Sequence, residues 1–263
     1  MLRILMPLLL VAASFAQSTP AFDSAAEQQI LQLLNRERHS RGLSTLIFDE
    51  RLQRAARRHS MSMANRGEVE HQLSGEPKLA SRLGEVALRY DASGENVART
   101  STAERAHVAL MNSPGHRANI LDPVFNSVGI GVVNTPDGIY VTQDFARRLP
   151  DASVEDAEER TAANLNRLRK EVGLVSWKRV TAPELRVQAC EMARRDKLNP
   201  RLGLLSTKVS NSVAFTAIDL SQIPASLDRL KITSASGFSV GACYSASASY
   251  ENPVFWIVVV TYF

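Results

Sequence analysis

Two stretches of this chain carry the same residues at the same spacing, and this self-similarity constrains the fold more than any other feature. Residues 34–36 read Leu-Asn-Arg and are followed by Gly-Leu at 42–43. Residues 165–167 repeat Leu-Asn-Arg and are followed by Gly-Leu at 173–174, at the same distance along the chain. Recurrence at a fixed spacing is typical of a duplicated structural unit.

Two further segments recur in the same order. A helical pattern around Leu52 has a counterpart around Leu185, and the run Phe-Asn-Ser-Val-Gly at 125–129 has a counterpart, Phe-Ser-Val-Gly, at 238–241. An apolar, strand-like segment follows each run. We therefore expect two tandem copies of one domain, each of ordinary domain size. The alternative is a second, unrelated α+β unit.

The boundary between the two copies is expected within residues 147–157, where prolyl, seryl and acidic residues form a polar linker. This places one domain at 24–148 and a second at 155–263. The second copy has no histidine and no glutamate between Asp196 and Phe238. We expect it to be a degenerate copy that cannot assemble a polar site of the kind described below.

Local patterns in the first copy predict helices followed by a hairpin. Ser24 and Glu27 have the spacing of a capping box, which predicts a helix over 24–41. A second helix is expected from Asp49 to Gly67. A long irregular stretch follows, interrupted by a helical patch at 79–88. Two alternating segments joined through Asp137 and Gly138 predict a β-hairpin near the end of this copy.

The first residues of the chain have the pattern of a secretory signal peptide. One arginine, Arg3, precedes a short apolar run that ends in Ser14-Phe15-Ala16, so cleavage is expected after Ala16 and residues 1–16 are expected to be removed. The run is too short for a stable transmembrane span, although an uncleaved anchor is the alternative. No later segment resembles a transmembrane helix. We expect a secreted or periplasmic protein.

The charge pattern argues against a nucleic-acid ligand. The formal net charge is only +4, and the basic residues are not interleaved with aromatic side chains. The chain has two cysteines, Cys190 and Cys243, both in the second copy. In an oxidising compartment they are candidates for a disulfide, and the alternative is two separate buried thiols.

Polar motifs are concentrated in the first copy, where all five histidines lie. Together with the apolar motifs around them, they resemble the CAP superfamily (cysteine-rich secretory protein, antigen 5, pathogenesis-related 1), specifically its bacterial secreted branch. The segments that carry the resemblance are Leu34-Asn35-x-x-Arg38, Gly42-Leu43-x-x-Leu46, Gly94-Glu95-Asn96-Val97-Ala98, Met111-Asn112-Ser113-Pro114-Gly115-His116-Arg117-Ala118-Asn119-Ile120-Leu121 and Val128-Gly129-Ile130-Gly131-Val132.

The resemblance implies an α+β fold, an α-β-α sandwich with helices on both faces of a mostly antiparallel sheet. It also implies a central cleft in which His71, Glu95 and His116 take the positions of the family's two histidines and first glutamate. The family's second glutamate falls on Ser113, and the tryptophan before it falls on Leu110. This departure weakens any mechanism that needs two carboxylates.

The chemistry of such a cleft leaves several functions open. Two neutral imidazoles, His71 and His116, are candidate ligands for zinc, with Glu95 orienting a histidine or acting as a base. Two protein ligands are fewer than the three of a typical catalytic zinc site. Glu95 and Asn96 alternatively serve only to tie this segment to the sheet through buried hydrogen bonds. Ser113 is better explained as the cap of a short helix that Pro114 begins.

The three other histidines lie on expected helices without a motif around them. We expect His59 to be half-buried and satisfied by hydrogen bonds, and His39 and His107 to lie on the surface, and we assign no function to them.

The leading hypothesis is a secreted protein whose first copy binds a ligand in a cleft formed by His71, Glu95, His116, Ser113 and Asn96. The ligand is a small apolar molecule such as a lipid, a peptide or an envelope glycan, with zinc as the candidate cofactor. Binding is favoured over catalysis, which is left open. The alternatives are a zinc-assisted hydrolase of peptide or cell-wall substrates and a structural extracellular module.

Overall fold

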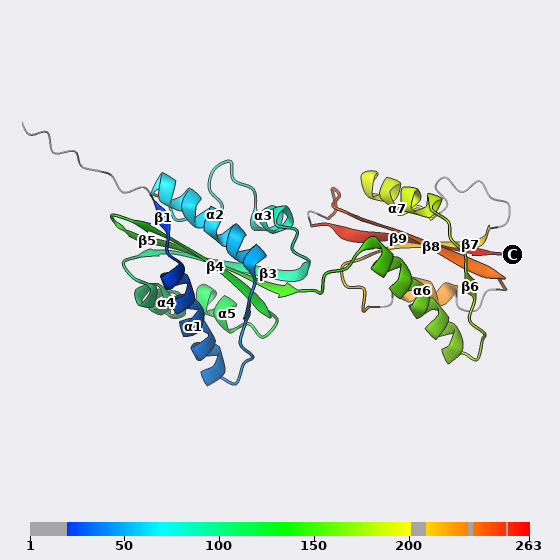
Figure 1. The fold of residues 1–263 in the computed structure, drawn as a ribbon, viewed down its shortest axis with the longest axis horizontal. Coiled ribbons are helices and arrows are strands. Elements are labelled where there is room, and N and C mark those ends of the chain that lie inside the picture. Colours follow the sequence, from blue (N-terminus) through cyan, green and yellow to red (C-terminus); the bar gives the residue numbers. More distant parts are fainter. Residues whose placement is uncertain (1–19, 201–208, 223, 231–233, 251) are drawn as a thin grey trace, which may run out of the picture.

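The computed structural model describes residues 20–200, 209–222, 224–230, 234–250 and 252–263. The expected signal peptide, residues 1–16, lies outside the described residues. Figure 1 shows two units of helices and strands side by side along the longest axis, joined by the segment that follows β5. Within the described ranges, every helix is too short or too polar to cross a bilayer.

The first unit contains α1 to α5 and β1 to β5. The helices are α1 (Ser24–Ser40), α2 (Glu50–Arg66), α3 (Leu79–Glu85), α4 (Ala103–Asn112) and α5 (Pro114–Leu121). The strands are β1 (Ala21–Phe22), β2 (Ile47–Phe48), β3 (Tyr90–Thr100), β4 (Ser127–Thr135) and β5 (Gly138–Arg148).

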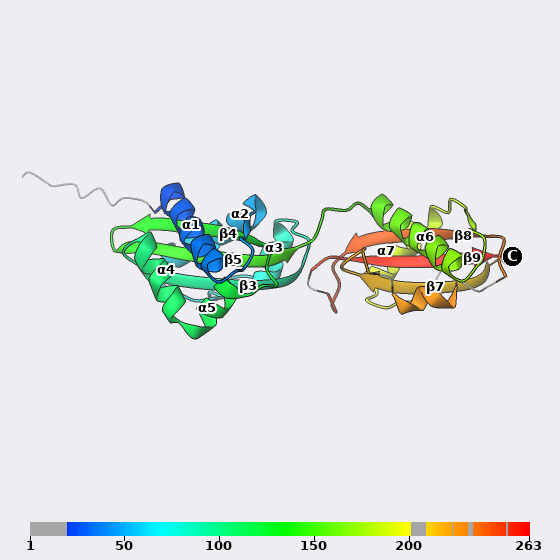
Figure 2. The same cartoon turned by 90° about the horizontal axis from the view of Figure 1, so that it is seen from below.

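One sheet organises this unit, with the order β1-β4-β5-β3 and β2 paired in parallel with the other end of β4. Figures 1 and 2 show α2 and α3 on one face of the sheet and α1, α4 and α5 on the opposite face. Separate apolar clusters fill the two sides, because alternate residues of β4 and β5 point to opposite faces. The unit therefore has the mixed helix-and-strand composition expected for an α+β fold.

Local rules explain where the helices begin and end. The Asp49 side chain accepts hydrogen bonds from the backbone N–H groups of Arg51 and Leu52, as expected for the cap of α2. Gly67 ends α2 with a φ of 71°, a conformation that favours glycine. At α1 the capping-box prediction is wrong. Asp23 is the N-cap and accepts from the Ala26 N–H, which leaves the Glu27 side chain for other partners.

The expectation of an irregular stretch after α2 is also partly wrong. Residues Tyr90–Thr100 form β3, which pairs antiparallel with β5, and Glu95 lies opposite Asp144. Glycine, glutamate and asparagine at 94–96 have low intrinsic preference for strands, which concealed β3 in the sequence. Pairing with the buried strand β5 overrides that preference. The predicted hairpin is confirmed, since β4 and β5 pair from Ser127↔Ala146 to Thr135↔Gly138.

Two glycines of β4 allow α2 to pack directly on the sheet. A Cβ atom at Gly129 would overlap with the backbone of Leu52 and Gln53, and one at Gly131 would overlap with the backbone of Ala56 and Arg57. These glycines are needed because helix and strand backbones approach too closely for a side chain.

The described residues of the second unit form two long helices and one sheet of order β6-β8-β9-β7. Figure 1 shows the two helices on opposite faces of this sheet. Its elements are α6 (Val154–Glu171), α7 (Glu184–Arg194), a short 3-10 helix η1 (Ala225–Arg229), β6 (Lys178–Arg179), β7 (Val209–Ala217), β8 (Gly237–Ser245) and β9 (Val254–Tyr262).

A disulfide joins Cys190 of α7 to Cys243 of β8, with Cα atoms 5.1 Å apart, so of the two alternatives left open for these cysteines the bonded pair is correct. Beside it, α7 packs on an apolar cluster of the sheet that includes Trp256 and Val258. The disulfide therefore fastens α7 to the face of the sheet that it already covers.

Several contacts occur at corresponding positions in the two units. Asn35 exchanges two hydrogen bonds with the backbone of Leu46, and Asn166 does the same with Trp177. The short strand β6 is parallel to β8, as β2 is to β4.

One buried arginine links the units. The Arg89 guanidinium donates to the carbonyl oxygens of Pro150 and Ile218 and lies over the Phe255 ring.

Candidate functional site

His71 and Glu95 lie in direct contact. His71 is in the loop after α2, Glu95 is on β3, and His71 Nδ1 is 3.0 Å from Glu95 Oε1. The His71 side chain is 59% exposed, whereas that of Glu95 is 4% exposed. A carboxylate next to Nδ1 favours the tautomer with the proton on Nδ1, which leaves Nε2 as an acceptor or metal ligand directed away from Glu95.

A buried arginine holds this pair. Arg82 Nη2 lies 2.6 Å from Glu95 Oε2 and also donates to the backbone oxygen of His71 at 3.1 Å. Arg82 and Glu95 are both buried, so each charge compensates the other in a medium where an isolated charge is costly. Glu95 is thus committed to Arg82 through one oxygen and to His71 through the other.

His59 also belongs to this network, although no motif around it predicted a role. It is fully buried rather than half-buried. Its Nδ1 lies 2.9 Å from Glu76 Oε1, and its Nε2 lies 2.9 Å from the backbone carbonyl oxygen of Glu70. The same Nε2 lies 3.9 Å from Glu95 Oε2. The one signal in the sequence was its position on the apolar stripe of α2.

Asp144 lies under the network as the neighbour of Glu95 across β3 and β5. It is fully buried, and its carboxyl group lies next to that of Glu95. Burial raises the pKa of Asp144 well above its usual range, and the charge of Glu95 raises it further. The neutral, protonated form is therefore favoured next to the Glu95 carboxylate.

His116 approaches His71 from the opposite side. It lies on α5, and the two imidazole ring centres are 6.1 Å apart, with the ring planes inclined by 50°. Burial lowers the pKa of His116, and the neighbouring His71 lowers it further, so the neutral imidazole is favoured. His71, Glu95 and His116, which the sequence grouped by resemblance, are brought together in the structure.

Asn96, another predicted member, has a supporting position, and it shares this role with Asn119, which was not predicted to belong to the site. Asn96 is fully buried, and its Nδ2 donates to the His116 backbone oxygen and to Gln143 Oε1, both at 3.0 Å. Asn119 Nδ2 donates to Asn96 Oδ1 at 2.9 Å and to the Glu95 backbone oxygen at 3.1 Å. These amides hold α5 against β3. Asn96 therefore positions His116 and is not itself directed to solvent.

Ser113 takes the expected position at the start of α5, before Pro114. It ends α4 and begins α5 without a side-chain capping hydrogen bond, so it is a cap by position only. No hydrogen bond joins its hydroxyl to His71 or His116 within the described part of the chain.

The prediction for His107 is wrong. His107 is 7% exposed because the stripe of α4 that carries it packs toward α1, and burial lowers its pKa. His39 is exposed, as expected.

The donor set limits the metal chemistry of this cluster. Among the described residues, no group of three or more histidine, cysteine, aspartate or glutamate side chains has the geometry to hold a metal ion. Glu95 is occupied by Arg82 and His71, so His71 and His116 remain as two imidazole donors. This set does not fit a catalytic zinc site, which needs three protein ligands.

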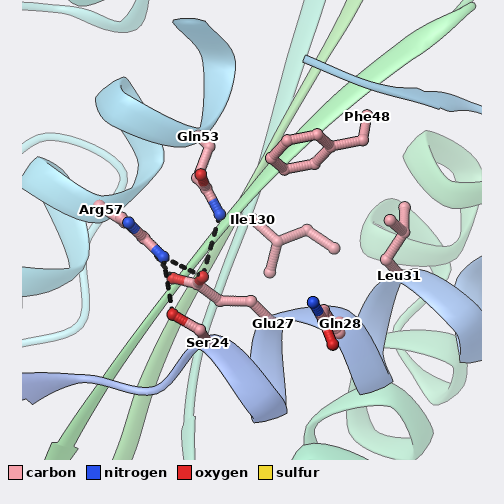
Figure 3. A pocket seen from close by; sticks show the side chains of 8 residues that line it. All are labelled: Ser24, Glu27, Gln28, Leu31, Phe48, Gln53, Arg57 and Ile130. Carbon is pink, nitrogen blue, oxygen red and sulfur yellow. Dashed lines mark hydrogen bonds and ion pairs between the residues drawn. The ribbon is translucent and has the colours of Figure 1, made fainter. Parts of the chain in front are cut away.

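A separate pocket lies at the open edge of the first sheet, with a volume of about 450 Å³. Figure 3 shows the Glu27 carboxylate between Arg57, Gln53 and Ser24. Its eight lining residues come from α1, α2 and the sheet edge, and none belongs to the histidine cluster: they are Ser24, Glu27, Gln28, Leu31, Phe48, Gln53, Arg57 and Ile130.

The chain is similar to several known proteins over its first half. It is 36% identical over 129 residues to the uncharacterized protein YkwD of Bacillus subtilis, which covers 49% of this chain and 49% of that protein. It is 32% identical over 126 residues to the uncharacterized membrane protein YlbC of the same organism, covering 48% of this chain and 35% of the relative. The chain thus matches half or less of the length of these relatives.

A solved structure gives a similar match. An extracellular protein containing a SCP domain from Bacillus anthracis is 31% identical, with 48% of this chain and 41% of that chain covered and a TM-score of 0.44. The model of the CAP family, the cysteine-rich secretory protein family, matches residues 31–145. Residues 31–145 are therefore similar to the CAP family, as are the two Bacillus subtilis relatives over the same half of the chain.

Proposed function

We propose that this is an exported protein whose CAP domain binds a polar ligand between His71 and His116. The observation that carries the proposal is the contrast in exposure within one hydrogen-bonded pair. Glu95 is buried and fixed by Arg82, while its partner His71 is mostly exposed and has Nε2 available. A buried carboxylate that orients an exposed imidazole is the arrangement by which proteins prepare a histidine for a ligand.

The ligand class follows from the groups that face solvent. His71 and His116 offer hydrogen-bonding nitrogens and flat rings, which suit a peptide or a glycan of the cell envelope better than a lipid. Neutral His116, favoured by its lowered pKa, adds an acceptor without adding charge. Asn96 ties the backbone of this histidine to β3, and Asn119 in turn holds Asn96.

Export is supported by the signal-peptide pattern of residues 1–16 and by the description of the related Bacillus anthracis protein as extracellular. The disulfide between Cys190 and Cys243 also fits an oxidising compartment.

We further propose that residues 24–148 form the ligand-binding domain and that residues 155–263 form a degenerate second copy of the same α-β-α sandwich. Corresponding asparagine contacts and the same parallel pairing of a short strand support this duplication. The second copy lacks the histidines, so we assign it a scaffold or adaptor role.

The first experiment is a calorimetric titration with zinc chloride, because zinc probes two neighbouring imidazoles directly. Wild-type protein is compared with His71→Ala/His116→Ala and with His39→Ala, which removes an exposed histidine outside the cluster. Weak binding that only the double variant loses supports the cluster as a ligand site. Binding that all three proteins share equally assigns the metal to other groups.

The second experiment tests the organic ligand by co-sedimentation with purified, insoluble peptidoglycan and, separately, with vesicles of phosphatidylglycerol and phosphatidylethanolamine. We expect retention on peptidoglycan that decreases in the double variant and persists in His39→Ala. Retention on vesicles alone would contradict the polar ligand class.

A structural role is the second candidate, supported by the buried pair of Glu95 and Arg82. In that case the cluster only holds the loop after α2 against β3. The double variant and wild type then behave alike in both the zinc titration and the co-sedimentation.

A further inference from the structure

The loop that carries His71 has little apolar packing of its own. Residues 67–78 join α2 to α3 without a helix or strand. Among these residues only Leu73 has a buried side chain, which packs in a small apolar cluster with Met63, Val97 and Tyr140. A segment with few buried apolar contacts opens easily unless hydrogen bonds hold it. The hydrogen bonds that reach this loop therefore determine where His71 lies.

His59 holds the loop on both sides of His71. It lies on α2, and its side chain is fully buried. Its Nε2 is 2.9 Å from the backbone oxygen of Glu70, the residue before His71. Its Nδ1 is 2.9 Å from the carboxylate of Glu76, near the end of the loop. One side chain of a long helix thus reaches both arms of the loop.

Both partners of His59 are hydrogen-bond acceptors. A backbone carbonyl oxygen and an ionised carboxylate have no proton to donate. A neutral imidazole has a single N–H, so its second nitrogen would face an oxygen lone pair. The Glu76 carboxylate also accepts from the Leu73 N–H at 3.3 Å, in keeping with the ionised form. Both bonds of His59 therefore require a proton on each ring nitrogen, which is the imidazolium form.

The charges that face His59 balance in this form. Its Nε2 lies 3.9 Å from Glu95 Oε2, and Arg82 Nη2 lies 2.6 Å from the same oxygen. Asp144, whose pKa is raised by burial and by the charge of Glu95, adds no charge when it is protonated. His59 and Arg82 are then two cations against the two carboxylates of Glu76 and Glu95. A buried network without net charge satisfies the requirement that buried charges be compensated.

We propose that His59 is a positioning residue for His71: as a buried imidazolium it bridges Glu70 and Glu76 and keeps the loop where His71 contacts Glu95. Arg82, which donates to the backbone oxygen of His71, holds the loop from α3. The inference deepens the ligand site proposed between His71 and His116, and its functional meaning rests on that proposal. The position of the loop is measurable without any ligand.

The protonation of His59 is tested by NMR on full-length protein labelled with ¹⁵N in its histidine rings. At neutral pH we expect two protonated nitrogens in the His59 ring. We expect one in the ring of His116, because burial lowers its pKa. The His59 signals are identified by their absence from His59→Leu/Glu76→Gln. A single protonated nitrogen in His59 of the folded wild-type protein would overturn the proposal.

Glu76→Gln separates the charge of His59 from its hydrogen bonds. A glutamine amide donates to Nδ1, and a neutral His59 with its proton on Nε2 still donates to the Glu70 oxygen. We therefore expect the His59 ring of this variant to lose one proton while the loop keeps its place. A His59 ring that remains doubly protonated in Glu76→Gln would show that Glu76 does not hold the second proton, and would overturn the proposed bridge.

The order of the loop is measured by ¹⁵N relaxation of the backbone amides of residues 70–76. Rigid backbone has an order parameter of about 0.85, and flexible backbone has one below about 0.6. We expect wild type and Glu76→Gln to be close to the first value and His59→Leu/Glu76→Gln to fall below the second, because leucine donates to neither acceptor. The paired substitution avoids leaving a carboxylate buried without its cation, so the rest of the domain should remain folded.

Arg66→Gln is the matched control for loop order. Arg66 also lies on α2 and donates to the loop, at the Ser74 oxygen at 2.8 Å, but this contact is exposed. The order parameters of this variant should equal those of wild type. Equal order parameters in Glu76→Gln and His59→Leu/Glu76→Gln would overturn the positioning role of His59.

These measurements use no ligand, so their outcome is distinct from that of the zinc and peptidoglycan experiments. If neither probe binds but the loop loses order in His59→Leu/Glu76→Gln, the ligand-binding proposal fails and the positioning of His71 stands. If the loop stays ordered in that variant, the positioning proposal fails whatever the cluster binds.

Discussion

Glu95 Oε2 lies 2.6 Å from Arg82 Nη2, and both side chains are buried. Removing one charge of a buried pair leaves the other uncompensated, so we expect Glu95→Gln to destabilise the protein by on the order of 3 kcal/mol. Urea unfolding of the two proteins measures this difference. Adding Arg82→Met to Glu95→Gln should restore part of the loss, because the uncompensated charge is then removed.

His71→Ala is the control for that experiment. Its side chain is 59% exposed, and exposed pairs contribute about 0–1 kcal/mol, so its stability should be close to wild type. An equal decrease in the free energy of unfolding for Glu95→Gln and His71→Ala would contradict a dominant role of Arg82 in holding Glu95.

Asp144 gives the protein a specific pH dependence. Because its pKa is raised in the folded state, the folded protein holds this proton more tightly than the unfolded chain does. The stabilisation is complete below about pH 4, near the unfolded pKa of an aspartate, and is lost as the pH rises through the folded pKa. We expect Asp144→Asn to be more stable relative to wild type at pH 8 than at pH 5.

Unfolding midpoints in urea at the two pH values measure this effect. Asp137→Asn, at an 80% exposed side chain in the β4–β5 turn, is the control and should keep the pH dependence of wild type. A wild-type dependence that persists in Asp144→Asn would show that other groups produce it.

The disulfide should stabilise the second unit alone. Its cysteines are separated by 53 positions, and closing a loop of this length contributes about 4 kcal/mol in the chain-entropy model. Both tryptophans, Trp177 and Trp256, lie in the second unit, so their fluorescence reports its unfolding. We expect Cys190→Ser/Cys243→Ser to shift that transition to lower urea. Wild-type protein treated with dithiothreitol should behave like the variant, and identical transitions with and without the disulfide would refute this prediction.

Gly129 determines how closely α2 approaches β4. A methyl group there would overlap with the helix backbone, so Gly129→Ala should cost about 1–3 kcal/mol through forced separation of the two elements. Gly115 on α5 has open space around its Cβ position, and Gly115→Ala should be neutral or slightly stabilising. Thermal unfolding of both variants provides the comparison, and equal melting temperatures would argue that α2 moves away at no cost.

Much of the first unit was predictable because its signals are local. The Asp49 cap, the end of α2 at Gly67 and the hairpin at Gly138 each depend on residues a few positions apart, and the structure confirms all three. The grouping of His71, Glu95 and His116 came from family resemblance, and the structure brings these residues together.

The supporting residues of the cluster were not predictable in the same way. Arg82, His59 and Asp144 carry no motif, and each acquires its role from partners on other elements that enclose it. Strand β3 was overlooked for a related reason, since pairing with β5 outweighs the weak strand preference of Gly94, Glu95 and Asn96.

Glu27 shows most clearly the difference between what the sequence determines and what the tertiary structure decides. By itself the sequence determined that a helix begins near Ser24, because helical periodicity acts over three or four residues. Only the tertiary structure decided that Glu27 turns away from the helix end to Arg57 and the Val132 N–H. A buried carboxylate takes the partners that compensate its charge, and the fold, by bringing α2 and β4 beside α1, determines which partners those are.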